Sequence, residues 1–115
     1  MTNGLIINDV SNVLIPGQSA IAVFTKGMNL NLRQGGISES GIWKVNEFRR
    51  VDKIIVYFRH DNLNEIIIGD HYDTIPSNVR NRFYLRFQNS HTAGFTSSNW
   101  KEFAVTGSHP VRYIL

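Results

Sequence analysis

The aromatic and arginine side chains of this sequence include types that together can hold a nucleotide. Aromatic rings stack on nucleobases, worth about 1–3 kcal/mol per base, and guanidinium groups reach phosphate oxygens or base edges. A base splayed out of a helix needs a pocket with such groups. The candidates of this first kind are Trp43, Arg82, Tyr84, Trp100, Arg112 and Tyr113.

One face of a predicted strand over residues 82–87 adds to this set. Arg82, Tyr84 and Arg86 alternate with apolar residues, and alternate residues of a strand share a face. We therefore expect the three polar side chains to lie opposite the core. Trp43 and Trp100 also suit a core, so the hypothesis depends on exposure of their rings.

A second group of candidates is basic. Lys44, Arg49, Arg50 and Lys53 could bracket phosphates, and the affinity of such a site would fall steeply with salt. Asn46 is the predicted N-cap of a short helix over residues 46–52. The alternative is a solvated helix face whose charges pair locally.

Two further sets of residues are titratable. The segment Asp70-His71-Tyr72-Asp73 has the residue types of a metal or acid–base site. Asp and His in a polar loop more commonly serve turn geometry, so we predict no metal and no cofactor. His60, His71, His91 and His109 could act in a small metal-independent ribonuclease of the barnase or RelE-like type, which we keep as an alternative.

The composition bounds the function further. The chain has 115 residues, a net charge of +3 and no cysteine, which predicts one domain over 1–115 and excludes thiolate metal sites and thiol nucleophiles. Eight of the 12 cations are arginine, a residue suited to phosphate and base edges. No apolar run approaches about 18 residues, so we expect no membrane span. The N-terminus lacks a basic region before its first apolar run, which favours a cytoplasmic protein without a signal peptide.

The hydrophobic periodicity is mostly that of strands. We predict strands over 19–25, 53–59, 65–69, 82–87 and 111–115. We predict a loop or a single helical turn over 38–41, loops over 72–79 and 88–98, a short helix over 46–52, and a turn or helix over 99–103. These elements favour an α+β fold, a small, mostly antiparallel β-barrel, closed or half-closed, with one or two short helices.

Two ordered motifs resemble a known domain. Gly41-Ile42-Trp43-Lys44-Val45-Asn46 leads into the predicted helix, and Gly107-Ser108-His109-Pro110-Val111-Arg112-Tyr113 closes the chain. They resemble a PUA-like domain of phage and bacterial proteins that also occurs beside GIY-YIG nuclease domains. The resemblance covers 37–115; the first 35 residues do not align, and 70–81 carries no landmark. It implies a pseudo-barrel related to the EVE, YTH and ASCH-type domains, some of which read modified bases.

We therefore predict a non-enzymatic module that binds nucleic acid or a nucleotide, including one with a modified base, in a phage or defence context. The predicted binding residues are Trp43, Lys44, Asn46, Arg49, Arg50, Arg82, Tyr84, Arg86, Trp100 and Arg112. A protein partner is the third possibility: an exposed edge strand over residues 28–32 would suit a phage-type inhibitor that acts by protein–protein interaction.

Overall fold

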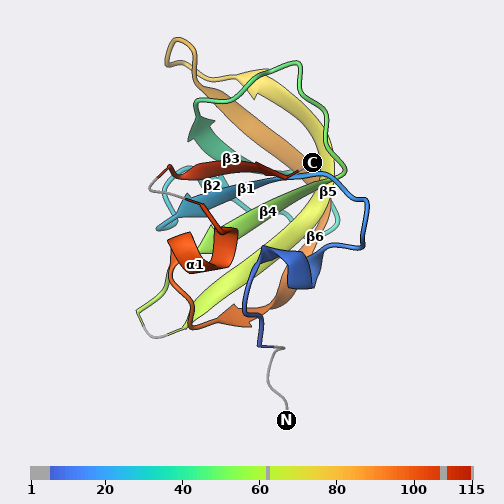
Figure 1. Ribbon diagram of the computed structural model, residues 1–115. Helices are drawn as coiled ribbons and strands as arrows, with labels where there is room; N and C mark the ends of the chain where they lie inside the picture. Colours follow the sequence, from blue (N-terminus) through green and yellow to red (C-terminus); the bar gives the residue numbers. More distant parts are fainter. Residues whose placement is uncertain (1–5, 62, 107–108, 115) are drawn as a thin grey trace.

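The computed structural model describes residues 6–61, 63–106 and 109–114. Seven strands form one sheet in the order β2-β3-β6-β5-β4-β1-β7 (Figure 1). The strands are β1 (Ala20–Thr25), β2 (Leu30–Asn31), β3 (Ser38–Trp43), β4 (Lys53–Phe58), β5 (Asn64–Pro76), β6 (Phe83–Thr96) and β7 (Val111–Ile114). β1 and β4 are parallel, and the other neighbours are antiparallel.

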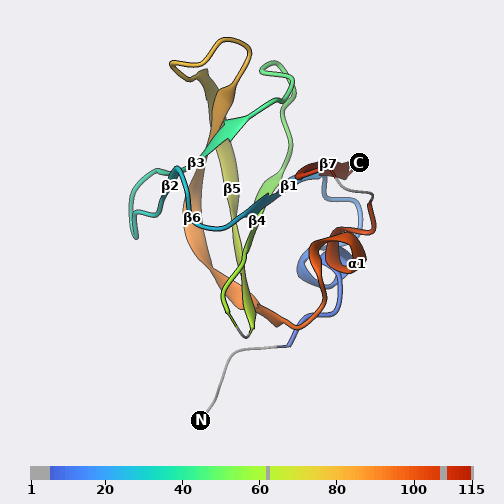
Figure 2. The ribbon, with the colours of Figure 1, turned by 90° about the vertical axis from the view of Figure 1, so that its left-hand side faces the viewer.

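Two short helices lie on the same side of the sheet (Figure 2). They are the 3-10 helix η1 (Val10–Val13) and the α-helix α1 (Trp100–Ala104). α1 begins at a capping box, in which the Asn99 side chain accepts from the Glu102 amide over 2.9 Å and Glu102 accepts from the Asn99 amide over 3.2 Å. No helix in the described ranges is long and apolar enough to cross a membrane.

The sheet has an apolar core on each face, because side chains along a strand alternate between faces. In β1, Ala20 and Ala22 face the helices, whereas Ile21 and Val23 face the other way. The helix-side core comprises chiefly Val10, Ala20, Ala22, Ile55, Tyr57, Ile66, Trp100 and Phe103. The opposite core comprises chiefly Ile21, Val23, Val45, Val51, Ile54, Val56, Ile67, Leu85 and Phe87.

The long β5–β6 hairpin bends around the opposite core. Its pairing shifts register at three places, between Ile66 and Ile67, between Ile68 and Asp70, and between His71 and Asp73. Such bulges bend a strand and increase its twist. The predicted barrel is not closed, since β2 and β7 are the two edges of an open sheet. The predicted α+β, mostly antiparallel class agrees with this architecture.

The predicted apolar strands are confirmed as β1, β4 and β7, and the predicted helix over 99–103 is confirmed as α1. The predicted loop over 38–41 is wrong, because it forms β3. Ser38 and Ser40 are 0% exposed there, and their hydroxyls are hydrogen-bonded. The Ser38 hydroxyl accepts from the Arg33 amide over 2.8 Å, and the Ser40 hydroxyl accepts from the Trp43 indole over 3.0 Å. Small polar residues can therefore line a buried strand face.

The predicted loops over 72–79 and 88–98 are also mostly wrong, since β5 continues to Pro76 and β6 runs to Thr96. The predicted helix over 46–52 is a turn, closed by a hydrogen bond of 3.1 Å from the Arg49 amide to the Asn46 carbonyl. Both ends of this segment are fixed in the opposite core, which leaves an exposed loop between them rather than a helix with a buried stripe.

Candidate functional site

Five of the residues considered for chemistry meet at one cavity, which we call the Trp43 pocket. Its volume is about 290 Å³, near the lower end for ligand pockets and suited to one nucleoside. It lies between the end of β3, the start of β6 and β7. Its lining residues are Trp43, Lys44, Arg82, His109, Pro110, Val111 and Tyr113.

The two aromatic rings of the Trp43 pocket are half-buried and fixed by hydrogen bonds. The Trp43 indole N–H donates to the Ser40 hydroxyl over 3.0 Å, and the Tyr113 hydroxyl accepts from the Asn46 amide over 2.8 Å. Both rings pack against the opposite core while contributing to the cavity wall. The pocket thus has pre-positioned aromatic surface, which limits the entropy lost on binding.

The loop over residues 44–50 begins at this pocket with Lys44 and is held against Tyr113, another lining residue. The Asn46 carboxamide accepts from the Phe48 amide over 2.9 Å, and the guanidinium carbon of Arg49 lies 5.1 Å from the centre of the Tyr113 ring. Phe48, at the tip of the loop, is 85% exposed. Sequence reasoning missed Phe48, because the predicted helix gave no reason to single it out.

The charge around the Trp43 pocket is positive. Among the described residues that line it, none is acidic. Lys44 and Arg82 are exposed, and neither forms an ion pair with a described residue. Arg49 adds a third cation next to the Tyr113 ring. The carboxylate nearest to Arg49 in the sequence is that of Glu47, on the same loop. A cavity with aromatic walls and unpaired cations favours a planar ligand with an anionic group.

Three other predicted residues lie outside this pocket. The Tyr84 ring covers the backbone of Gly41. The Arg86 guanidinium binds the Asp73 carboxylate through two hydrogen bonds, of 2.6 and 2.5 Å, and this pairing holds the pKa of Asp73 below its usual value. Arg50 is exposed and does not line the Trp43 pocket.

Trp100 and Arg112 lie on the other face of the sheet. Trp100 is 8% exposed and belongs to the helix-side core. The Arg112 guanidinium donates to the Ala104 carbonyl oxygen at the end of α1, where a cation and a free carbonyl stabilise each other. The structure therefore separates these two residues from Trp43 and Arg82.

A larger cavity, which we call the Trp100 pocket, opens beside α1 with a volume of about 580 Å³. Phe24, Tyr57 and Trp100 supply aromatic surface, while Arg59, His60 and Lys101 supply cationic or titratable groups. The buried Tyr57 hydroxyl donates to the Ser98 carbonyl oxygen over 2.6 Å, and burial raises its pKa. Apart from Trp100 and His60, sequence reasoning missed the residues of this pocket.

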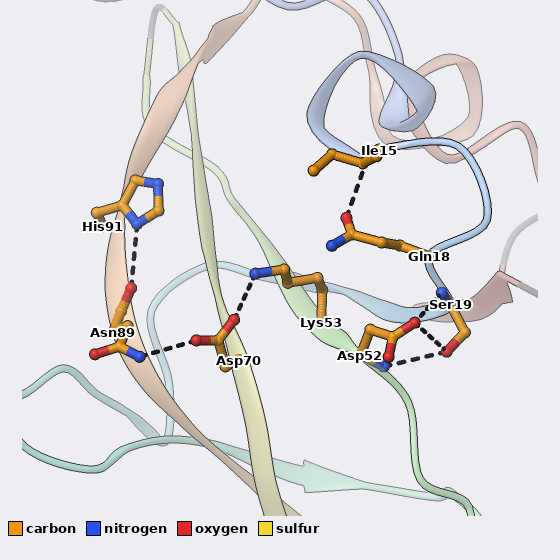
Figure 3. A network of polar contacts seen from close by, with 8 residues as sticks. All are labelled: Ile15, Gln18, Ser19, Asp52, Lys53, Asp70, Asn89 and His91. Atoms are coloured by element: carbon orange, nitrogen blue, oxygen red, sulfur yellow. Dashed lines mark hydrogen bonds and ion pairs between the residues drawn. The ribbon is translucent and has the colours of Figure 1, made fainter.

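The acidic segment over residues 70–73 is held by neighbouring protein groups. The Asp70 carboxylate pairs with the Lys53 ammonium and accepts from the Asn89 carboxamide over 2.8 Å (Figure 3). These hydrogen bonds hold the pKa of Asp70 below its usual value. Within the described ranges, no group of three or more His, Asp or Glu side chains is placed to hold a metal ion. The carboxylates of this segment therefore have a structural role, because Asp70 joins β5 to β4 and Asp73 joins β5 to β6.

His71, in the same segment, is buried as a neutral ring. The Val51 amide donates to Nδ1 over 3.2 Å, so the ring hydrogen sits on Nε2, which lies 3.0 Å from the Thr74 hydroxyl. Burial lowers the pKa of His71, and the positive charge of Arg50 lowers it further. Protonation would place a second hydrogen opposite the Val51 amide.

We expect the free energy of unfolding to decrease as the pH falls below about 6.5, the ordinary histidine pKa. Below that pH, His71 binds a proton in the unfolded chain but not in the folded protein, because its folded pKa is lowered. The contribution of neutral His71 to the free energy of unfolding is therefore fully present above that pH and declines below it. Urea unfolding between about pH 5 and pH 8 measures this dependence, which His71→Gln should reduce. His91→Gln, at an exposed position, is the control. An unchanged dependence in the His71 variant would contradict this prediction.

The four histidines considered as ribonuclease groups lie in different places. His60 is 3.2 Å from the Glu65 carboxylate and lines the Trp100 pocket. His109 lines the Trp43 pocket, His91 lines other surface cavities, and His71 is buried. Because acid and base must meet at one scissile bond, this placement gives the ribonuclease alternative no two-histidine site.

Comparison of the chain with protein families, with curated proteins and with solved structures finds no significant match. The functional conclusion therefore depends on the chemistry and geometry of the two pockets.

Proposed function

We propose that this protein binds single-stranded nucleic acid or a nucleotide at the Trp43 pocket without catalysing a reaction. The observation that carries the proposal is the combination of Trp43 and Tyr113 with Lys44 and Arg82 around one cavity whose lining has no carboxylate. The aromatic rings would contact the base, and the two cations would bind phosphate. Arg49, stacked on Tyr113, adds positive charge at the same place.

The exposed Phe48 supports the same function. Its loop is fixed by hydrogen bonds from Asn46 and Phe48 amides and carries Arg49 and Arg50 beside it. An aromatic ring in a basic loop offers a stacking surface for a base next to the pocket. A duplex would have to splay its bases to use either surface, so a single strand is the favoured form.

The resemblance to PUA-like domains gives this proposal a context. We propose that the open, bent sheet is a variant of that pseudo-barrel, and that the chain acts as a reader of bases, including modified ones, in a phage or defence setting. An inhibitory protein–protein contact through residues 28–32 is less favoured, because β2 pairs only two residues with β3. Short edge strands are poor templates for strand addition.

Binding of the double variant K44A/R82A tests the proposal. Fluorescence anisotropy with labelled single-stranded oligonucleotides should show a loss of affinity of about 100- to 10,000-fold, since charged hydrogen bonds contribute about 1.5–3 kcal/mol each and the variant removes two of them. The slope of log affinity against log salt should also decrease by about 1–2, because two phosphate contacts are lost. Neither side chain is buried, so the variant should remain folded.

The matched control is K26A/R33A, which removes the same charge from two exposed positions outside both pockets. It should lower affinity only slightly, through the reduced net charge. Equal losses in the two double variants would mean that binding is non-specific, and no binding by the wild-type protein would reject the proposal. Labelled RNA recovered intact would separate binding from ribonuclease activity.

A further inference from the structure

The Trp43 and Trp100 pockets are separated by only two residues. Pro110 lines both cavities, and His109 lines the Trp43 pocket beside it. Two residues span at most about 7 Å. Neighbouring nucleotides of one single strand, with their bases splayed apart, can therefore reach both cavities.

Residues His109 and Pro110, which we call the His109–Pro110 ridge, lie between the pockets and are hydrogen-bonded to aromatic residues of the Trp100 pocket. The Trp100 indole donates to the His109 carbonyl oxygen over 2.7 Å, and the Phe24 amide donates to the Pro110 carbonyl oxygen over 2.9 Å. Beyond the ridge, β7 begins at Val111 and continues to Tyr113 in the Trp43 pocket. The relative positions of the two cavities are therefore set by the fold.

The Trp100 pocket shares exposed cations and an aromatic ring with the Trp43 pocket, and it differs in having a carboxylate in its lining. Arg59 and Lys101 are exposed at its rim, and Asp61 is the carboxylate among the described residues that line it. His60 has its ring stacked on Phe58, with centres 4.3 Å apart, and its Nε2 atom near Glu65. Of the three aromatic rings of this pocket, Phe24 is half-buried, whereas Tyr57 is 2% and Trp100 is 8% exposed. The rim thus keeps two cations beside the accessible part of the Phe24 ring, which can stack on a base.

We propose that the Trp100 pocket is a second subsite, which holds another nucleotide of the same single strand that occupies the Trp43 pocket. In this arrangement the nucleic-acid strand crosses the edge of the β-sheet at the His109–Pro110 ridge, and its bases turn toward opposite faces of the sheet. Single-stranded nucleic acid permits this, because its unstacked bases can be splayed apart. The inference rests on the proposed function and makes the ligand a polymer rather than a free mononucleotide.

The test measures how tightly the double variants R59A/K101A and K44A/R82A bind single-stranded octamers. An octamer of thymidylate and an octamer of uridylate are both used, to distinguish DNA from RNA. R59A/K101A should lower octamer affinity by at least about tenfold, as K44A/R82A does, whereas K26A/R33A should not. In Trp43→Phe, Trp100 is the remaining tryptophan. Its emission should change when the octamer binds, and R59A/K101A in that background should shift the change to higher concentration.

The outcomes separate the second subsite from the proposed function. If R59A/K101A behaves like K26A/R33A while K44A/R82A loses affinity, the second subsite is rejected and the Trp43 pocket stands. If R59A/K101A alone loses affinity, the shared strand and the proposed role of the Trp43 pocket are both rejected. If neither pair differs from the control, both proposals fail. Circular dichroism of each variant excludes unfolding as the cause.

Discussion

Replacing Trp100 with alanine should lower the free energy of unfolding by about 3–5 kcal/mol, the usual range for deleting a buried aromatic side chain. The ring packs against Phe24, Tyr57 and Phe103, with centres 6.0, 5.7 and 6.5 Å away. Its indole N–H also donates to the His109 carbonyl oxygen. The substitution leaves a cavity and an unpaired carbonyl, and chemical denaturation followed by circular dichroism measures the loss.

Trp43→Ala is the matched control for this prediction. Trp43 is half-buried and contacts the opposite core at its margin, so its removal should cost clearly less stability than removal of Trp100. Its main effect should be on ligand binding. A greater loss of stability in the Trp43 variant than in the Trp100 variant would contradict the assignment of Trp100 to the core.

The apolar strands could be predicted from the sequence, and the polar ones could not. Residues 54–58 form an apolar run in which 54–57 are buried on both faces of the sheet, which is a strong local signal. β3 and the second half of β6 are polar, and they are strands because a neighbouring strand pairs with them. Ser38 and Ser90, 52 residues apart, share a hydrogen bond of 3.0 Å across that pairing. Local periodicity contains no information about such partners.

The candidate site was predictable in part for a related reason. Residue type placed Trp43, Arg82 and Tyr113 in one set, and these three residues line one cavity, which Lys44 of the other set also lines. Arg112 and Tyr113 were grouped together, although consecutive residues of a strand face opposite sides; alternation alone would have separated them. The Trp100 pocket lies where β1 and β4 end side by side, and the parallel pairing of these strands is a long-range feature.

Gly69→Ala should lower the free energy of unfolding by about 3 kcal/mol, the upper end of the usual cost of overpacking a core. A β-carbon at Gly69 would lie 2.6 Å from the Phe87 ring and 2.9 Å from the Gln88 carbonyl oxygen. Phe87 is 0% exposed, and so is Ile54, which pairs with Gly69 from β4. The added methyl group would therefore force the β5–β6 backbone apart at a bulge.

Gly41→Ala is the comparison variant for Gly69→Ala. The added methyl group would clash with a side chain at Gly41, but with both a buried ring and a backbone carbonyl oxygen at Gly69. A β-carbon at Gly41 would meet the half-buried Tyr84 side chain and no backbone atom among its nearest contacts. We expect a loss of only about 1 kcal/mol, the lower end of the same range. Urea unfolding of both variants gives the comparison. Equal losses would mean that the β5–β6 backbone at Gly69 adjusts as readily as the half-buried Tyr84 side chain does. The bent hairpin would then not be a rigid support for the two pockets.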